Sequence, residues 1–191
     1  MRHGEDEQDG ARPTRLSREA AEAPAVVRAQ LGANSPLIRD LAERLRRSPP
    51  AAVVTLGRGS SDHAATFARY LIETRLGVMT ASAPPSVSSV YDVAQGVRGA
   101  LCLAISQSGR SPDILAAAEA AREAGALVVA LVNDASSPLA ELAEITAPLL
   151  AGPELSVAAT KSYIAALSAI VQLVALWSGD AKLQAALDWL P

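Results

Sequence analysis

Short apolar runs that alternate with helical stretches constrain the fold of this chain more than any other feature of its sequence. The runs occupy residues 51–56, 78–81, 100–105 and 127–132, with a weaker one at 147–150. Strands that are buried on both faces of a parallel sheet have this continuous apolar pattern. Apolar residues at helical spacing lie between or after the runs, at 61–76, 112–124, 137–144 and 158–177. Because the connections are short, this alternation predicts an α/β fold, a three-layer α/β/α sandwich with a parallel sheet of about five strands.

The first fifty residues predict helices that pack on this sheet. Ser17 is the predicted N-cap of a first helix, which Pro24 kinks or splits. A second helix is expected to start at Asn34 or Ser35, just before Pro36. The chain then divides into a disordered tail at 1–16, N-terminal helices at 17–50, the sheet domain at 51–179, and a last helix or the start of a linker at 180–191.

Composition narrows the classes of partner and the compartment. The formal net charge is −3 and aromatic residues make up 3% of the chain, so neither a basic surface nor a stacking platform for nucleic acid is expected. The single cysteine, Cys102, forms no intramolecular disulfide, which favours a reducing, cytoplasmic setting. The polar N-terminal sequence does not resemble a secretory signal, and no apolar run approaches the roughly 20 residues of a membrane span, so no membrane association is expected.

Two Gly- and Ser-rich segments stand where the first and third predicted strands end. They read GRGSSDH at 57–63 and SQSGRSPD at 106–113, and each leads directly into a predicted helix. Glycine lets the backbone approach a ligand, and a helix N-terminus presents free N–H groups with partial positive charge. Four side chains of the second segment can surround a phosphate without a fixed cation: Ser106, Gln107, Ser108 and Ser111. The alternative is a pair of ordinary turns in which Ser111 caps a helix that begins at Pro112.

A third segment, AGPELSVAATKSY at 151–163, follows the weak fifth strand. Lys161 stands near the N-terminus of a long apolar helix, where a positive charge opposes the helix dipole. Either Lys161 reaches solvent or pairs with Glu154, or it helps to order a ligand site.

Together, the three segments resemble the sugar isomerase (SIS) domain family. The resemblance covers roughly residues 17–180 and is closest to the isomerase portion of glucosamine-6-phosphate synthase and to relatives without a glutaminase domain, including glucosamine-6-phosphate deaminases. It implies a flavodoxin-like sandwich and a phosphosugar ligand. It also implies a set of phosphate- and sugar-binding residues: Ser60, Ser61, Ser106, Gln107, Ser108, Gly109, Ser111, Val157, Ala159 and Lys161.

Departures from the synthase pattern resemble the glutaminase-free branch. Arg110 and Ser111 stand where synthases usually have Glu-Thr, and Arg58 replaces a small or sulfur-containing residue. Cys102 lies in an apolar run and is expected in the core, so glutamine-dependent amide transfer is not expected. In two-domain relatives a second SIS domain supplies the glutamate and lysine of proton transfer. The expected partner is therefore a second SIS domain, with its linker starting in 180–191, or a second copy in a homodimer.

The resemblance implies isomerisation or deamination of an amino-sugar phosphate, such as glucosamine 6-phosphate, through an enediol(amine). This chemistry needs a base that serves two adjacent carbons and an acid for ring opening, but no metal or cofactor. Glu154 is the candidate base and His63 the candidate acid, with a surface or packing role left open for His63. Two other hypotheses remain: a non-catalytic phosphosugar-binding SIS half, and a structural half that dimerises through the helix at 158–177.

Overall fold

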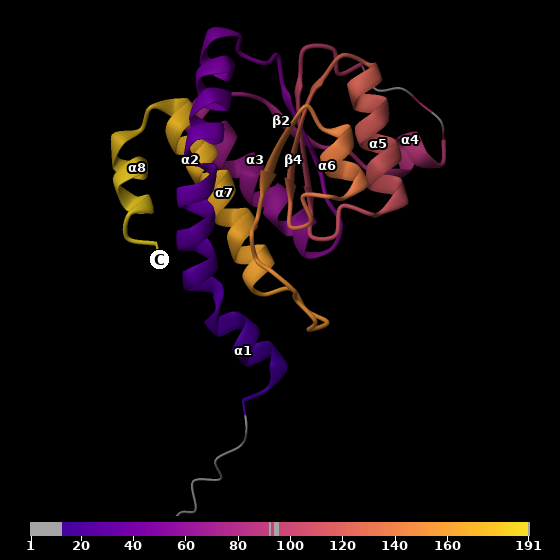
Figure 1. Ribbon diagram of the computed structural model, residues 1–191. Coiled ribbons are helices and arrows are strands. Elements are labelled where there is room, and N and C mark those ends of the chain that lie inside the picture. Colours follow the sequence, from indigo (N-terminus) through magenta and orange to yellow (C-terminus); the bar gives the residue numbers. More distant parts are fainter. Residues whose placement is uncertain (1–12, 92, 94–95, 191) are drawn as a thin grey trace, which may run out of the picture.

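A computed structural model describes residues 13–91, 93 and 96–190 (Figure 1). Five strands form one sheet, and each neighbouring pair is parallel. The strands are β1 (Val53–Leu56), β2 (Thr80–Ser82), β3 (Leu101–Ser106), β4 (Leu127–Val132) and β5 (Ile145–Pro148). They confirm the predicted α/β class and the parallel sheet. The fifth strand starts two residues before the predicted run and ends before Leu150, whose φ of 55° lies outside the extended region.

The strand order, β2-β1-β3-β4-β5, decides where a ligand can bind. The chain passes from β1 to one neighbour, β2, and then crosses to the other neighbour, β3. In open parallel sheets, ligands bind outside the carboxyl ends of the strands at such a topological switch point. The segments that follow β1 and β3 are the two Gly- and Ser-rich segments of the sequence, and the order places them side by side.

Helices cover both faces of the sheet (Figure 1). One layer holds α2 (Ala23–Arg47), α3 (Ser60–Leu76) and α7 (Lys161–Ser178), and the other holds α4 (Ser86–Ser89), α5 (Pro112–Glu123) and α6 (Pro138–Leu142). Along β3, Leu101 and Leu103 pack on the first layer, and Cys102 and Ala104 pack on the second. Cys102 is fully buried, which confirms its predicted place in the core, and this burial raises the pKa of its thiol to about 12.

The first helix, α1 (Arg15–Ala21), starts earlier than predicted. Its N-cap is Thr14 rather than Ser17, because the Thr14 hydroxyl accepts a hydrogen bond from the Ser17 amide at 3.2 Å. The chain turns at Glu22, and Pro24 lies in the first turn of α2, as the predicted split requires. Of the predicted tail, residues 1–12 lie outside the described residues, and Arg15 and the residue after it are helical.

The prediction of a second helix start at Asn34 or Ser35 was wrong, because α2 continues through Pro36. A proline inside a helix removes one intrahelical hydrogen bond. The buried positions nevertheless keep a spacing of three or four residues across it: Val27, Gln30, Asn34, Ile38, Leu41 and Leu45. The Gln30 side chain donates to the Ala165 carbonyl at 3.1 Å, and that of Asn34 donates to the Pro148 carbonyl at 2.8 Å. Packing on α7 and β5 therefore outweighs the local signal of the proline.

The long apolar helix α7 begins at Lys161, three residues after the predicted start, and ends before Gly179. By length and composition alone it could cross a membrane, but 67% of it is buried inside this chain. Its apolar residues pack against α2 and α3, and α8 (Ala181–Leu187) lies beside its end. Most of the apolar face of α7, through which the dimerisation hypothesis expected a second copy to bind, is therefore already covered by other helices of the same chain.

Candidate functional site

The first site segment connects β1 to α3. Gly59 is the N-cap of α3 and provides no side-chain hydrogen bond, and in the first turn the Ser61 and Asp62 amides donate to the Arg58 and Gly59 carbonyls at 3.1 Å and 3.0 Å. Ser60 and Ser61 lie half-buried in this turn, and His63 is exposed one position beyond Asp62. The structure thus brings Ser60, Ser61 and His63 to the carboxyl edge of the sheet, as the sequence predicted from the strand end.

The second segment, 106–111, is held firmly between β3 and α5. The buried Ser106 hydroxyl accepts a hydrogen bond from the Gly109 amide at 3.0 Å, and the Gly109 carbonyl accepts one from the Leu139 amide at 3.2 Å. The Gln107 carbonyl accepts from the Asn133 amide at 3.3 Å. These contacts connect the loop to Asn133 after β4 and to Leu139 in α6.

Three side chains of this loop remain available to a ligand. Gln107 is exposed, and Ser108 and Ser111 are half-buried. Ser111 is the N-cap of α5, but its hydroxyl makes no capping hydrogen bond. The N-cap position of Ser111 and the helix start at Pro112 agree with the ordinary-turn alternative, but the side-chain hydrogen bond of a capping serine is missing. Pro112 at the start of α5 has no N–H, and the Ile114 amide donates to the Asp113 carboxylate at 3.0 Å.

Two arginines tie the site together, which the sequence analysis did not anticipate. Arg58 in the first loop pairs with Asp113 in the first turn of α5 at 3.0 Å, and so connects the two segments. Arg110 pairs with Asp134 after β4 at 2.9 Å. Hydrogen bonds from the Ser136 side chain and from Arg110 lower the pKa of the Asp134 carboxyl to about 2. The expected cradle without cations therefore has two guanidinium groups at its edge.

In the third segment, Glu154 organises the start of α7. One carboxylate oxygen accepts hydrogen bonds from the Thr160 amide at 2.8 Å and the Thr160 hydroxyl at 2.9 Å, and the other accepts from the Ser162 hydroxyl. Burial raises the pKa of Glu154, but the Ser162 and Thr160 bonds outweigh it, so the net pKa is lowered. Glu154 acts here as a cap of α7, and its carboxylate is a weakened base.

Lys161 is buried and pairs with Glu22, at 2.5 Å, rather than with Glu154 or with solvent as the sequence analysis considered. Glu22 lies at the junction of α1 and α2, far away in sequence, and no local pattern indicates the pair. Val157 is fully exposed in the loop before α7, and Ala159 is half-buried.

Asn133 belongs to the candidate site by its contacts, although no sequence motif indicated it. Its side chain accepts from the Ala151 amide at 2.7 Å and donates to the Gly152 carbonyl at 2.8 Å, while its own amide binds the Gln107 carbonyl. It thereby connects the second segment to the third. The available signal was its position directly after β4, because polar residues at strand ends gather at one edge of a parallel sheet.

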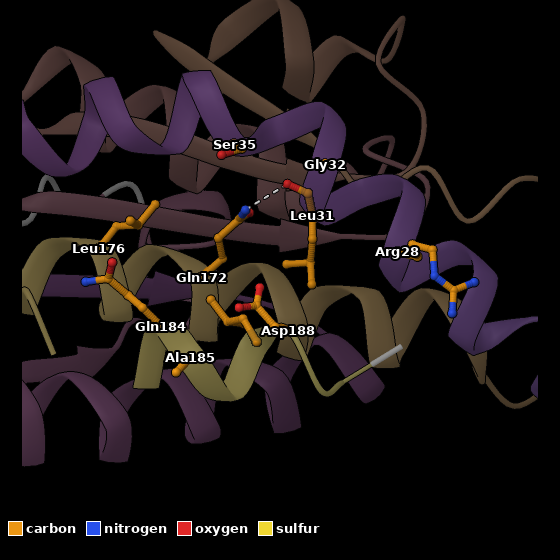
Figure 2. A pocket seen from close by; sticks show the side chains of 10 residues that line it. Arg28, Leu31, Gly32, Ser35, Gln172, Leu176, Gln184, Ala185 and Asp188 are labelled. Atoms are coloured by element: carbon orange, nitrogen blue, oxygen red, sulfur yellow. Dashed lines mark hydrogen bonds between the residues drawn. The ribbon is translucent and has the colours of Figure 1, made fainter. Parts of the chain in front are cut away.

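The hollow between α2, α7 and α8 is a separate feature (Figure 2). It measures about 610 Å³, and in it the Gln172 side chain donates to the Leu31 carbonyl at 2.9 Å. None of the site residues predicted from the sequence lines it. Within the described part of the chain, no group of three or more His, Cys, Asp or Glu residues is placed to hold a metal ion.

The chain is thus an α/β protein with an open parallel sheet, whose two switch-point strands end in Gly- and Ser-rich loops, and ligands of such sheets bind outside the carboxyl ends of the strands. The sequence model of one family, described as the SIS domain, matches residues 48–176. The chain belongs to the SIS domain family.

Similarity to known proteins agrees with this assignment. The isomerizing glutamine–fructose-6-phosphate aminotransferase of Thermococcus kodakarensis is 31% identical over 162 residues, which are 84% of this chain and 26% of that enzyme. A solved structure described as a candidate phosphosugar isomerase, from Silicibacter pomeroyi DSS-3, is 47% identical with a TM-score of 0.91 and matches 94% of this chain and 55% of that one. The NanR protein of Vibrio vulnificus, solved with ManNAc-6P, shares the fold at 20% identity and a TM-score of 0.72, over 95% of this chain and 68% of that one. The chain spans about half of the solved phosphosugar isomerase and about a quarter of the aminotransferase.

The capping role of Glu154 gives a first prediction. Glu154→Gln should lower the free energy of unfolding by about 1–2 kcal/mol at pH 7, because hydrogen bonds to a carboxylate are stronger than those to an amide and a negative charge stabilises a helix N-terminus. A carboxyl whose pKa is lowered on folding stabilises the fold above its ordinary pKa and loses that contribution as pH falls through the folded value. Urea unfolding should therefore show the difference between variant and wild type shrinking as pH is lowered from 7 through the carboxyl range. A constant difference would contradict the capping role.

Proposed function

We propose that this chain binds a phosphosugar at the carboxyl edge of its sheet, with the phosphate on loop 106–111 and the first turn of α3. The observation that carries the proposal is the uncommitted hydroxyl of Ser111 at the start of α5, next to Gln107 and Ser108 and at the switch point of the sheet. A hydrogen bond to a charged group contributes about 1.5–3 kcal/mol, so three or four such bonds are enough for micromolar affinity. Ser60 and Ser61 extend the cradle from the first loop, and the sugar extends toward Val157 and Ala159.

Relatives support this class of ligand. The Thermococcus kodakarensis enzyme is by name an aminotransferase of fructose 6-phosphate, and the solved NanR protein holds ManNAc-6P. An amino-sugar phosphate such as glucosamine 6-phosphate is therefore the ligand that we propose to test first, with fructose 6-phosphate as the second.

We further propose isomerisation or deamination of that ligand through an enediol(amine), in which a base takes the proton from one carbon and returns it to the next. His63 is the proposed acid for ring opening, because it is exposed on the first turn of α3 beside the cradle. Glu154 is the candidate base of this chain, but its oxygens already accept hydrogen bonds from Thr160 and Ser162. This engagement favours the second candidate function, a phosphosugar-binding module whose base comes from elsewhere.

The source of such a base would be a second SIS domain or a second copy of the chain. The share that this chain covers of the solved relative, 55%, supports an arrangement of two halves. We propose a cytoplasmic location, since the single cysteine of the chain forms no intramolecular disulfide.

Calorimetry of the purified chain tests the proposal. Glucosamine 6-phosphate or fructose 6-phosphate should bind with micromolar affinity, whereas unphosphorylated glucosamine should bind at least a hundredfold more weakly, since the phosphate carries most of the hydrogen bonds. Equal affinities for glucosamine 6-phosphate and glucosamine, or no binding of either phosphosugar, would refute the proposed function. Turnover of glucosamine 6-phosphate by the same sample separates the enzyme from the binding module.

A further inference from the structure

We propose that two carboxylates of the N-terminal helices, Glu19 and Glu22, hold the loop at 151–160 in the conformation that completes the phosphosugar site. They are positioning residues, and the inference rests on the function proposed above. Both lie outside residues 48–176, the part of the chain that the SIS family model matches. The N-terminal segment would thus control the affinity of a site formed by the family domain.

Glu19 binds two consecutive amides of the loop. Its carboxylate oxygens accept hydrogen bonds from the Leu155 amide at 2.7 Å and from the Ser156 amide at 3.1 Å. The side chain is buried although it belongs to a largely exposed helix. The Ser156 side chain and the Leu155 amide lower the pKa of Glu19, so it is a carboxylate at neutral pH. Charged acceptors make stronger hydrogen bonds than neutral ones, which makes this contact a substantial restraint on the loop.

Glu22 lies one helical turn further along and binds the residue at which α7 begins. Its carboxylate is 2.5 Å from the Lys161 ammonium, and the Lys161 side chain is only 4% exposed while that of Glu22 is 55% exposed. A buried ammonium without a partner is strongly destabilising, so Lys161 keeps this contact. Because the two glutamates are three residues apart, one short segment at the end of α1 holds both the middle of the loop and the first residue of α7.

Apolar packing cannot replace this restraint. Leu155 is 67% exposed and Val157 is fully exposed, so the centre of the loop buries little surface. The other anchors lie at its two ends, where Asn133 holds Ala151 and Gly152, and Glu154 holds Thr160. The segment between them contains the two residues, Val157 and Ala159, that we place against the sugar. Without Glu19, the ends of that segment would stay anchored, but its middle would have no fixed conformation.

The experiment compares Glu19→Gln and Glu22→Gln with a matched control, Glu43→Gln, which changes an exposed glutamate elsewhere on α2. Hydrogen exchange of the free protein should be at least tenfold faster in peptides from 151–160 for Glu19→Gln, with no change in β3 or β4. Affinity for glucosamine 6-phosphate should fall about fivefold or more in Glu19→Gln and in Glu22→Gln, because a loop without a fixed conformation must be ordered when the ligand binds. Affinity for inorganic phosphate should stay at the wild-type value, because loop 106–111 binds it.

The outcomes separate this inference from the proposed function. Unchanged exchange at 151–160 in Glu19→Gln overturns the clamp whether or not the protein binds a phosphosugar. Faster exchange with unchanged affinity for glucosamine 6-phosphate overturns the role in the site. An equal loss of affinity for inorganic phosphate and for glucosamine 6-phosphate also overturns the role in the site, because that pattern indicates general damage to the protein. If wild-type protein binds no phosphosugar, the proposed function fails and the role in the site fails with it.

Discussion

The double variant Ser108→Ala with Ser111→Ala is expected to bind glucosamine 6-phosphate at least tenfold more weakly than the wild type. Each hydroxyl would donate to a phosphate dianion, and a hydrogen bond to a charged group contributes about 1.5–3 kcal/mol. Water can replace part of each lost bond, so tenfold is the lower limit that we set. Calorimetry measures the change directly.

Stability should hardly change in this variant, because neither serine supports the fold strongly. The Ser111 hydroxyl does not cap α5, and that of Ser108 only accepts a long bond of 3.3 Å from the Arg110 amide. Ser106 is a poorer choice, since it holds the Gly109 amide and its loss would disturb the loop itself. Ser48→Ala, at the opposite edge of the sheet, is the control and should leave the affinity unchanged. Wild-type affinity in the double variant would remove the basis of the proposed phosphate site.

The fold could be predicted largely because its signals are local. Each strand is a continuous apolar run, and β3 is buried at all six of its residues. Polar groups at the ends of β1 and β3 predicted a candidate site at one edge of the sheet, because the carboxyl ends of parallel strands meet there. The same rule would have found Asn133, had it been applied to β4.

What could not be predicted depends on contacts between distant parts of the chain. The proline at 36 is a local signal to start a helix, but packing of α2 on α7 and β5 overrides it. The partner of Lys161 is 139 residues away at Glu22, and the amides bound by Glu19 are 136 and 137 residues away. One sequence without an alignment carries no signal for such pairs. The hydrogen bonds of Glu154 are local, with Thr160 and Ser162 only 6 and 8 residues away, but they depend on the path of the loop, which no sequence pattern indicates.

Gly109→Ala should strongly destabilise the fold and the candidate site. Gly109 has a φ of +64°, and a Cβ there would lie 2.1 Å from the Ser137 hydroxyl oxygen and 2.8 Å from a methyl carbon of Val132. Ser137 cannot easily move, because it is fully buried and its hydroxyl caps α6 by accepting a bond from the Ala140 amide. The left-handed conformation costs about 1–2 kcal/mol and overpacking about 1–3 kcal/mol, so we expect a loss of about 3–4 kcal/mol.

Gly77→Ala separates backbone strain from the steric clash. Gly77 has almost the same φ, +67°, but a Cβ there would meet nothing within 4 Å. The free energy of unfolding of Gly77→Ala should therefore fall only by the cost of the strained backbone, about 1–2 kcal/mol. For a chain of this size this corresponds to a fall in Tm of roughly 2–8 °C, compared with roughly 6–16 °C for Gly109→Ala. Calorimetric scans measure both, and phosphosugar binding should be lost only in Gly109→Ala, since only there does the cradle move. Equal losses of stability in the two variants would show that loop 106–111 can move to accommodate the added methyl group. The close contact between Gly109 and Ser137 would then not be what fixes the conformation of this loop.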